Sequence, residues 1–364
     1  MVIYYIIFFL LLFLAIVRDL FFLNERICLV FCFCILVIFA GLRDIDVSKD
    51  GENYVTGFQT MGAPLEYFSK FDDWFFFEPA YYLFPSLLRL AFPTYYVFLV
   101  FLLFAIIGVH INLKGIFKLS LFPILSVVVY YSHNYLLHEM TQIRVGVACG
   151  LLLLSTYYHF HKKHIAFIFS ILIALLFHYV ALLTALIFFL KSTTFSRKWA
   201  LLILIIAMMI AVVRSDLLIT PLLQLNFVFI LKLVKTLQGM DEERNAINIF
   251  NVAFLMNLAV LIWIIIKAHT IQQKNKYAYL AIKVHLLSVV LYFLFSAISM
   301  VAFRLYEFFG IISIVTVPFI VHTLRIKIFS YCLVFFYAIG IMAINLHVSD
   351  LLRPYTFYKL QALW

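Results

Sequence analysis

The chain has few charged residues. Of its 364 residues 12% are charged and 66% are hydrophobic, with a mean hydropathy of +1.10. A typical soluble domain is about half apolar and about a quarter charged. No stretch of the sequence has the polar surface needed to close a separate globule. The composition therefore excludes a water-soluble fold, and we expect residues 1–364 to form a single transmembrane domain.

Cysteine is also scarce. Cys28, Cys32 and Cys34 lie in one apolar run, and Cys149 and Cys332 lie in two others. This distribution is typical of small buried hydrophobic residues and indicates neither a disulfide framework nor a zinc site.

Other signatures are missing as well. No glycine loop that would cradle phosphate is present, and no second His follows His138 and Glu139 at the zinc-protease spacing. The net charge of +10 comes from small basic clusters without a continuous patch, which argues against nucleic acid as a partner. Residues 2–17 have no basic segment before them and are interpreted as a retained helix.

Apolar runs are abundant. A helix of about 20 apolar residues crosses roughly 30 Å of hydrocarbon and satisfies its own backbone groups. The runs predict an all-α polytopic membrane protein with about twelve transmembrane helices, near residues 2–17, 27–41, 94–112, 119–137, 143–160, 164–177, 179–190, 199–213, 249–267, 278–302, 308–323 and 329–346.

Lysine and arginine are sorted between alternate loops. One set of loops carries fifteen basic and two acidic residues, a net charge of +13, and the remainder of the chain has a net charge of −3. Because cytoplasmic loops carry the excess of basic residues, the first set is expected in the cytoplasm. Both termini and the two longest loops, 42–93 and 214–248, are then extracytoplasmic.

Two expected spans are too short to cross a bilayer. Residues 164–177 and 179–190 reach only about 18 to 21 Å as helices, which predicts a hairpin that stops within the bilayer with His178 at its tip. Such a hairpin usually borders a cavity. The alternative is one long helix over 164–190, which would invert the downstream topology. The basic pairs on both sides favour the hairpin.

Each long outer loop contains an expected surface segment. Within 214–248, residues 217–237 place Lys232 and Lys235 among apolar residues, as in an amphipathic helix that lies in the membrane interface. Within 42–93, residues 79–91 are interpreted as an interfacial or partly inserted segment.

Polar residues beside apolar helices are costly and therefore suggest function. Five such segments converge on the outer face. They contain Arg43, Asp50, Tyr54, Glu78 with Pro79, Gln142 with Arg144, Phe177 with His178, and Arg304 with Glu307. Their order and content resemble the EpsG family of polysaccharide-assembly membrane proteins, which is related to the Wzy-type O-antigen polymerases. The resemblance covers roughly residues 40–325. At one point the usual Gly-Thr-Asp reads Ser48-Lys49-Asp50.

The resemblance implies a GT-C-like glycosyltransferase in the bacterial inner membrane, with its active site facing the periplasm. It would transfer a growing oligosaccharide from undecaprenyl diphosphate onto a hydroxyl of the next lipid-linked repeat, making O-antigen or a related surface polysaccharide. Lipid-linked oligosaccharides, membrane lipids and a chain-length regulator are the implied partners, and no cofactor or metal is expected.

This chemistry requires cations for the diphosphate and a base near the acceptor hydroxyl. Arginine suits the first task because its planar fork meets phosphate oxygens in pairs. We expect substrate contacts from Arg43, Tyr54, Gln142, Arg144, Arg214 and Arg304. The catalytic candidates are Asp50, Glu78, His178 and Glu307.

Arg304 is the sharpest hypothesis. It is expected to end one apolar span, with Glu307 beginning the next, so that Arg304 clamps the diphosphate and Glu307 orients it. A purely structural ion pair between these two residues is the alternative. Similarly, His178 could only cap the hairpin, and Arg144 could only complement Glu139 and Gln142.

Two other functions remain open, and one apparent motif is discounted. Asp44 and Asp46 match the Asp-x-Asp of nucleotide-sugar transferases, but the motif occurs readily by chance. A flippase for the same lipid-linked repeats would also need a basic cavity, although the sequence shows no internal repeat of the kind that transporters often have. A polysaccharide ligase is the near alternative among enzymes.

Overall fold

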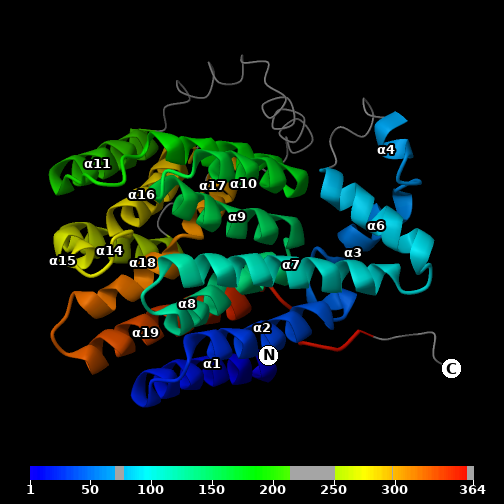
Figure 1. Cartoon of the computed structure of the whole chain (residues 1–364), viewed down its shortest axis with the longest axis horizontal. Helices are drawn as coiled ribbons and strands as arrows, with labels where there is room; N and C mark the ends of the chain where they lie inside the picture. Colours follow the sequence, from blue (N-terminus) through cyan, green and yellow to red (C-terminus); the bar gives the residue numbers. More distant parts are fainter. Residues whose placement is uncertain (70–77, 214–250, 297, 359–364) are drawn as a thin grey trace.

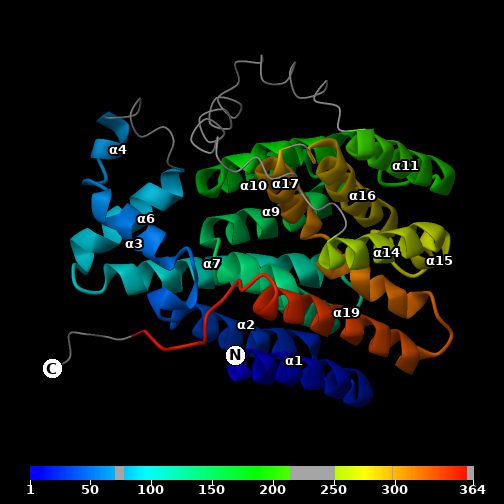
Figure 2. The same ribbon diagram turned by 180° about the vertical axis from the view of Figure 1, so that it is seen from behind.

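The computed structural model describes residues 1–69, 78–213, 251–296 and 298–358. These residues are almost entirely helical, and the helices run side by side along the long axis of the molecule (Figures 1 and 2). Strand pairing within the described residues is limited to two isolated bridges, Arg43 with Phe357 and Ser48 with Leu352. Both bridges join the first outer loop to the C-terminal segment.

The first half of the chain forms two N-terminal helices, a group of short helices and a central helical core. Its elements are α1 (Val2–Phe21), α2 (Glu25–Gly41), η1 (Ile45–Val47), α3 (Gly51–Thr60), α4 (Glu66–Ser69), α6 (Pro79–Ala91), α7 (Tyr96–Leu119), α8 (Pro123–Tyr130), the π-helix η2 (Tyr131–Glu139) and α9 (Ile143–Phe160).

The second half packs around this core. Its elements are α10 (His164–Phe177), the 3-10 helix η3 (Tyr179–Phe189), α11 (Arg197–Val213), α14 (Val252–Ile266), α15 (Ala268–Gln272), α16 (Ala278–Leu294), α17 (Ser299–Gly310), α18 (Ser313–Thr316), η5 (Val317–His322) and α19 (Lys327–His347).

The prediction of an all-α membrane protein is confirmed, but a count of twelve spans is not. By length and composition, α1, α7, α9 and α19 can each cross a membrane, and α17 with Ser313–His322 can form a fifth span that is bent by 45°. Several expected spans are shorter or divided, because an apolar run does not reveal where the backbone breaks. The run 119–137 is divided between α8 and the π-helix, and the run 278–302 ends its helix at Leu294.

Among the described residues, the two sets of loops lie at opposite ends of the bundle, as their charges predicted. At the strongly basic end, Asn275 Nδ2 donates to the Leu119 carbonyl (3.1 Å) and Lys283 donates to the Thr194 carbonyl (2.5 Å). At the other end, the Lys49 ammonium lies 3.3 Å from the Asp350 carboxylate. Figures 1 and 2 show α3, α4 and α6 at this second end, far from the turn between α1 and α2.

The predicted hairpin is present, and its end within the bilayer stays a prediction. Residues on either side of His178 form α10 and η3, and the end of η3 returns to the start of α10. The Phe188 ring lies 5.8 Å from the His164 ring and 6.2 Å from the Phe167 ring. His178 therefore occupies the turn, in extended conformation, as the residue between the two helices.

Glycines bring α7 and α9 into close contact. A Cβ added at Gly150 would lie 2.8 Å from Ile111 Cγ2, and one added at Gly115 would lie 2.7 Å from Leu153 Cβ. Gly146 and Gly150 form the G-x-x-x-G pattern that allows membrane helices to approach closely. This contact fixes the first turn of α9, which carries Arg144.

Two loop predictions have different outcomes. The expected outer segment 79–91 forms a helix with the same bounds, α6. The expected amphipathic helix 217–237 and the whole of the loop 214–248, including Arg214, lie outside the described residues.

Candidate functional site

Glu78 joins two other elements at the end of the bundle that carries α3 and α6. It directly precedes Pro79, which begins α6, and its side chain is 1% exposed. Its Oε2 accepts a hydrogen bond from Arg144 Nη1 at 2.5 Å, and its Oε1 lies 2.9 Å from His178 Nδ1. One buried carboxylate thus connects the start of α6, the start of α9 and the turn between α10 and η3.

Arg144 is the second residue of α9 and lies among tyrosines. Its guanidinium carbon is 4.3 Å from the centre of the Tyr81 ring and 5.8 Å from that of Tyr54. Such cation–π contacts hold a guanidinium in place without neutralising it. Since 28% of the Arg144 side chain remains exposed, the positive charge is accessible beside its contact with Glu78.

The contact with Glu78 determines which His178 nitrogen is available. The carboxylate paired with Arg144 can only accept hydrogen bonds, so Nδ1 of His178 carries the proton of the 2.9 Å bond. The neutral ring then has a lone pair on Nε2. A carboxylate and a histidine arranged in this way form the orienting half of a general-base system.

Asp50 and Arg304 complete the cluster. Burial raises the pKa of Asp50 above its ordinary value, and the nearby Arg144 and Arg304 guanidinium groups oppose that rise. Arg304 is exposed on α17 and makes no hydrogen bond or ion pair with the part of the chain that the structure describes. Two arginines with accessible charge, from α9 and α17, therefore lie near the same carboxylates.

The expected pairing of Arg304 with Glu307 is wrong. Both residues lie inside α17 and do not end one span and begin the next. Glu307 Oε2 instead lies 2.7 Å from His133 Nε2. Residues three apart on a helix are close enough to pair, but the carboxylate of Glu307 bonds to a histidine on the π-helix η2.

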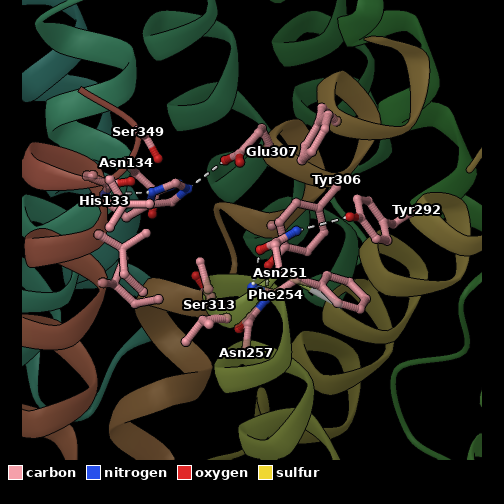
Figure 3. A pocket seen from close by; sticks show the side chains of 18 of the residues that line it. His133, Asn134, Asn251, Phe254, Asn257, Tyr292, Tyr306, Glu307, Ser313 and Ser349 are labelled. Atoms are coloured by element: carbon pink, nitrogen blue, oxygen red, sulfur yellow. Dashed lines mark hydrogen bonds and ion pairs between the residues drawn. The ribbon is translucent and has the colours of Figure 1, made fainter. Parts of the chain in front are cut away.

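Glu307 and His133 line a separate cavity of about 430 Å³ between η2, α14, α16, α17 and α19 (Figure 3). Asn345 Nδ2 donates to His133 Nδ1 at 3.0 Å. His133 therefore presents its Nε2–H to Glu307. Among the described residues Glu307 belongs to this cavity, whose lining includes neither Glu78 nor Arg304.

The remaining predicted residues have different positions. Arg43 is buried; it donates to the Ala40 carbonyl and its guanidinium carbon lies 4.6 Å from the centre of the Phe101 ring. Gln142 precedes α9, and its carbonyl accepts from the Val145 amide at 2.9 Å. Arg43 is thus packed in the interior, while Gln142 lies near the cluster.

Asp44 has a local structural role, because its carboxylate accepts from the Ile45 amide at 2.8 Å and caps η1. No group of three His, Cys, Asp or Glu side chains within the described residues is arranged as metal ligands would be.

Sequence reasoning missed Tyr81, His133 and Asn345. The run Ser132, His133 and Asn134 is a polar interruption of an apolar segment, which is a signal of function in membrane helices. Tyr81 gave no such signal, because a tyrosine among aromatic residues is common at a membrane interface.

The fold and the cluster define a helical membrane protein. At the less basic end of its bundle lie two arginines, Arg144 and Arg304, and a carboxylate–histidine pair, Glu78 and His178. The family model of the EpsG family matches residues 26–357. The chain belongs to the EpsG family, which is associated with polysaccharide synthesis and polymerase activity. No curated protein and no solved structure shows significant similarity to the chain.

Proposed function

We propose that the protein is a glycosyltransferase that polymerises lipid-linked oligosaccharide repeats, as in the assembly of O-antigen or a related surface polysaccharide. The observation that carries the proposal is Glu78, which binds both Arg144 and His178. Near it lies Arg304, which pairs with no group among the residues that the structure describes. Cations for a leaving diphosphate and an oriented base for a hydroxyl are the two components that this transfer requires.

In the proposed reaction, Arg144 and Arg304 bind the diphosphate of the donor, which is undecaprenyl-diphosphate-linked oligosaccharide. His178 Nε2 removes the proton from a hydroxyl of the acceptor repeat. The bond between the donor sugar C1 and the diphosphate oxygen breaks, and a bond between C1 and the acceptor oxygen forms. The lipid diphosphate leaves with its electron pair, and the arginines stabilise its charge.

The charge distribution supports an orientation for this site. The cluster lies at the end opposite the loops that carry the net charge of +13. By the positive-inside rule, that end faces away from the cytoplasm. We therefore place the reaction at the periplasmic face of the bacterial inner membrane, where a chain-length regulator of the same pathway could bind.

The test uses the full-length protein purified in detergent micelles and supplied only with undecaprenyl-diphosphate-linked repeats. We expect products with several repeats on one lipid, detected by gel electrophoresis and mass spectrometry. A flippase needs two membrane sides and a ligase needs a different acceptor, so neither extends the chain under these conditions. If the protein is folded and the substrate remains unchanged, the proposed polymerase function is rejected.

Variants then connect the activity to the site. His178→Gln should reduce the rate by about 10²-fold or more, because it removes the general base. Arg304→Gln should also reduce it strongly. Arg325→Gln, the same change on an exposed arginine at the opposite end, is the matched control and should keep the wild-type rate.

A further inference from the structure

The cavity that contains Glu307 has a ligand-sized volume and a mixed lining. Its volume of about 430 Å³ lies within the roughly 300–1,000 Å³ that is usual for small-molecule sites. Its lining includes the aromatic residues Phe254, Tyr292 and Tyr306, the amide Asn257 and the carboxylate Glu307 (Figure 3).

The aromatic rings form one wall. The centre of the Tyr306 ring lies 5.3 Å from that of Tyr292 and 5.5 Å from that of Phe254, and Phe254 and Tyr292 are stacked at 4.2 Å. Phe254 and Tyr292 are almost fully buried, so Tyr306 is the ring of this wall that has surface and a hydroxyl group left for a ligand.

The hydroxyl groups retain hydrogen-bond donors. Tyr306 accepts from Asn257 Nδ2 at 2.7 Å, and Tyr292 accepts from Asn251 Nδ2 at 3.2 Å. Since each hydroxyl has one proton to donate, Tyr306 keeps its O–H for another acceptor. Glu307 supplies acceptor oxygens, with 19% of its side chain exposed. The cavity thus offers both a donor and acceptors to a ligand.

The charge of the residues that line the cavity argues against an anionic ligand. No lysine or arginine contributes to the lining in the described part of the chain, and Glu307 is the acidic member. A diphosphate is disfavoured beside a carboxylate, whereas a neutral molecule rich in hydroxyl groups matches both the donors and the acceptors. A sugar residue has this chemistry.

The position of Arg304 indicates which sugar residue of the substrate would occupy the cavity. Arg304 and Glu307 are three residues apart on α17, a spacing that places side chains roughly 5–6 Å apart at Cβ. A sugar attached directly to a diphosphate at Arg304 would therefore reach the side of the cavity formed by Glu307.

We propose that the cavity binds the sugar residue attached to the diphosphate of the lipid-linked substrate, with Glu307 and Tyr306 as its polar contacts. This inference deepens the proposed function and rests on it for the identity of the substrate. It assigns the sugar and the diphosphate to two adjoining sites, the cavity of Glu307 and the cluster of Arg144 and Arg304.

Gly310 provides a test that does not require removal of a packed side chain. It lines the cavity, and a Cβ added there would meet no heavy atom within 4 Å. Gly310→Phe should therefore fill the cavity with its ring, whereas Gly310→Ala is the matched control that leaves it open. Tyr306→Phe removes one hydroxyl, and Tyr279→Phe makes the same change near His269, outside the cavity lining.

The first probe is the reducing oligosaccharide released by mild acid from the host's lipid-linked pool, and its binding to the purified full-length protein is measured by saturation-transfer NMR. We expect binding by wild type, Gly310→Ala and Tyr279→Phe, loss of binding by Gly310→Phe, and about fivefold weaker binding by Tyr306→Phe. Equal binding by wild type and Gly310→Phe, or no binding by folded wild type, would overturn the proposal.

The second probe is undecaprenyl diphosphate without sugar, which separates this inference from the proposed function. Gly310→Phe should bind it as wild type does, whereas Arg304→Gln should bind it less well. Oligosaccharide binding that Gly310→Phe abolishes would support the sugar site even if the purified protein formed no polymer. Polymer formation by Gly310→Phe at the wild-type rate would reject the sugar site. It would leave the proposed polymerase function unaffected.

Discussion

Glu78 and Arg144 form an ion pair in which the carboxylate is almost fully buried, with Oε2 of Glu78 2.5 Å from Nη1 of Arg144. The pair connects the outer segment α6 to the core helix α9. Removal of one partner leaves the other charge uncompensated in a poorly solvated position, which costs more than the pair itself contributes.

We therefore expect Glu78→Gln to lower the free energy of unfolding by about 2 kcal/mol, measured by thermal unfolding in detergent. The double change Glu78→Gln with Arg144→Gln should cost less than the sum of the single changes, because these residues share one interaction. Additive effects would show that the pair contributes no coupling energy.

Arg304→Lys should shorten the polymer and lower activity about tenfold or more, since a point charge cannot replace two parallel hydrogen bonds to phosphate. The charge exchange Arg304→Glu with Glu307→Arg should not restore activity, because Glu307 bonds to His133. The measurement is polymer length in a deletion strain complemented by each variant, with expression checked in membranes. Polymer of normal length from either variant would show that Arg304 does not bind the diphosphate through two parallel hydrogen bonds.

Asp50 predicts a pH dependence of stability. Burial raises its pKa in the folded state, so the folded protein binds this proton more tightly than the unfolded chain. Stability is then lost as pH rises from about 4, the unfolded pKa, through the folded pKa. The melting temperature of Asp50→Asn should fall less than that of wild type over this range. Glu52→Gln, at an exposed position on α3, should behave as wild type.

Gly150→Val should destabilise the contact between α7 and α9, because the new Cβ would lie 2.8 Å from Ile111 Cγ2 and 3.0 Å from the Asn112 backbone nitrogen. Overpacking of this kind costs about 1–3 kcal/mol. The yield of monodisperse protein after detergent extraction measures the effect. Gly310→Val is the control, since its Cβ has open space, and equal losses from both would contradict the explanation.

Orientation can be tested at Lys49, whose side chain is 53% exposed. In a background without native cysteines, Lys49→Cys should react with a membrane-impermeant reagent once the outer membrane is permeabilised. Lys163→Cys, at the opposite end, should react only after the inner membrane is ruptured. The reverse pattern would invert the topology and place the cluster on the cytoplasmic side.

Part of the site could be read from the sequence. Glu78, Arg144, His178 and Arg304 are polar residues beside apolar helices, where a charged group is costly enough to stand out. The hairpin at His178 also followed from segment length, since 14 residues of helix are too short to span. The residues around Glu307 could not be placed in the same way, because their partners come from four other elements.

The sequence by itself determined an all-α membrane protein, the sorting of its loops to two ends, and the short hairpin, because hydrophobic length and charge act locally along the chain. Tertiary structure alone decided that Glu307 pairs with His133 and not with Arg304, and that Arg43 is buried against Phe101. A helical residue has neighbours in several directions, and which of them it contacts depends on the packing of helices that are distant in sequence.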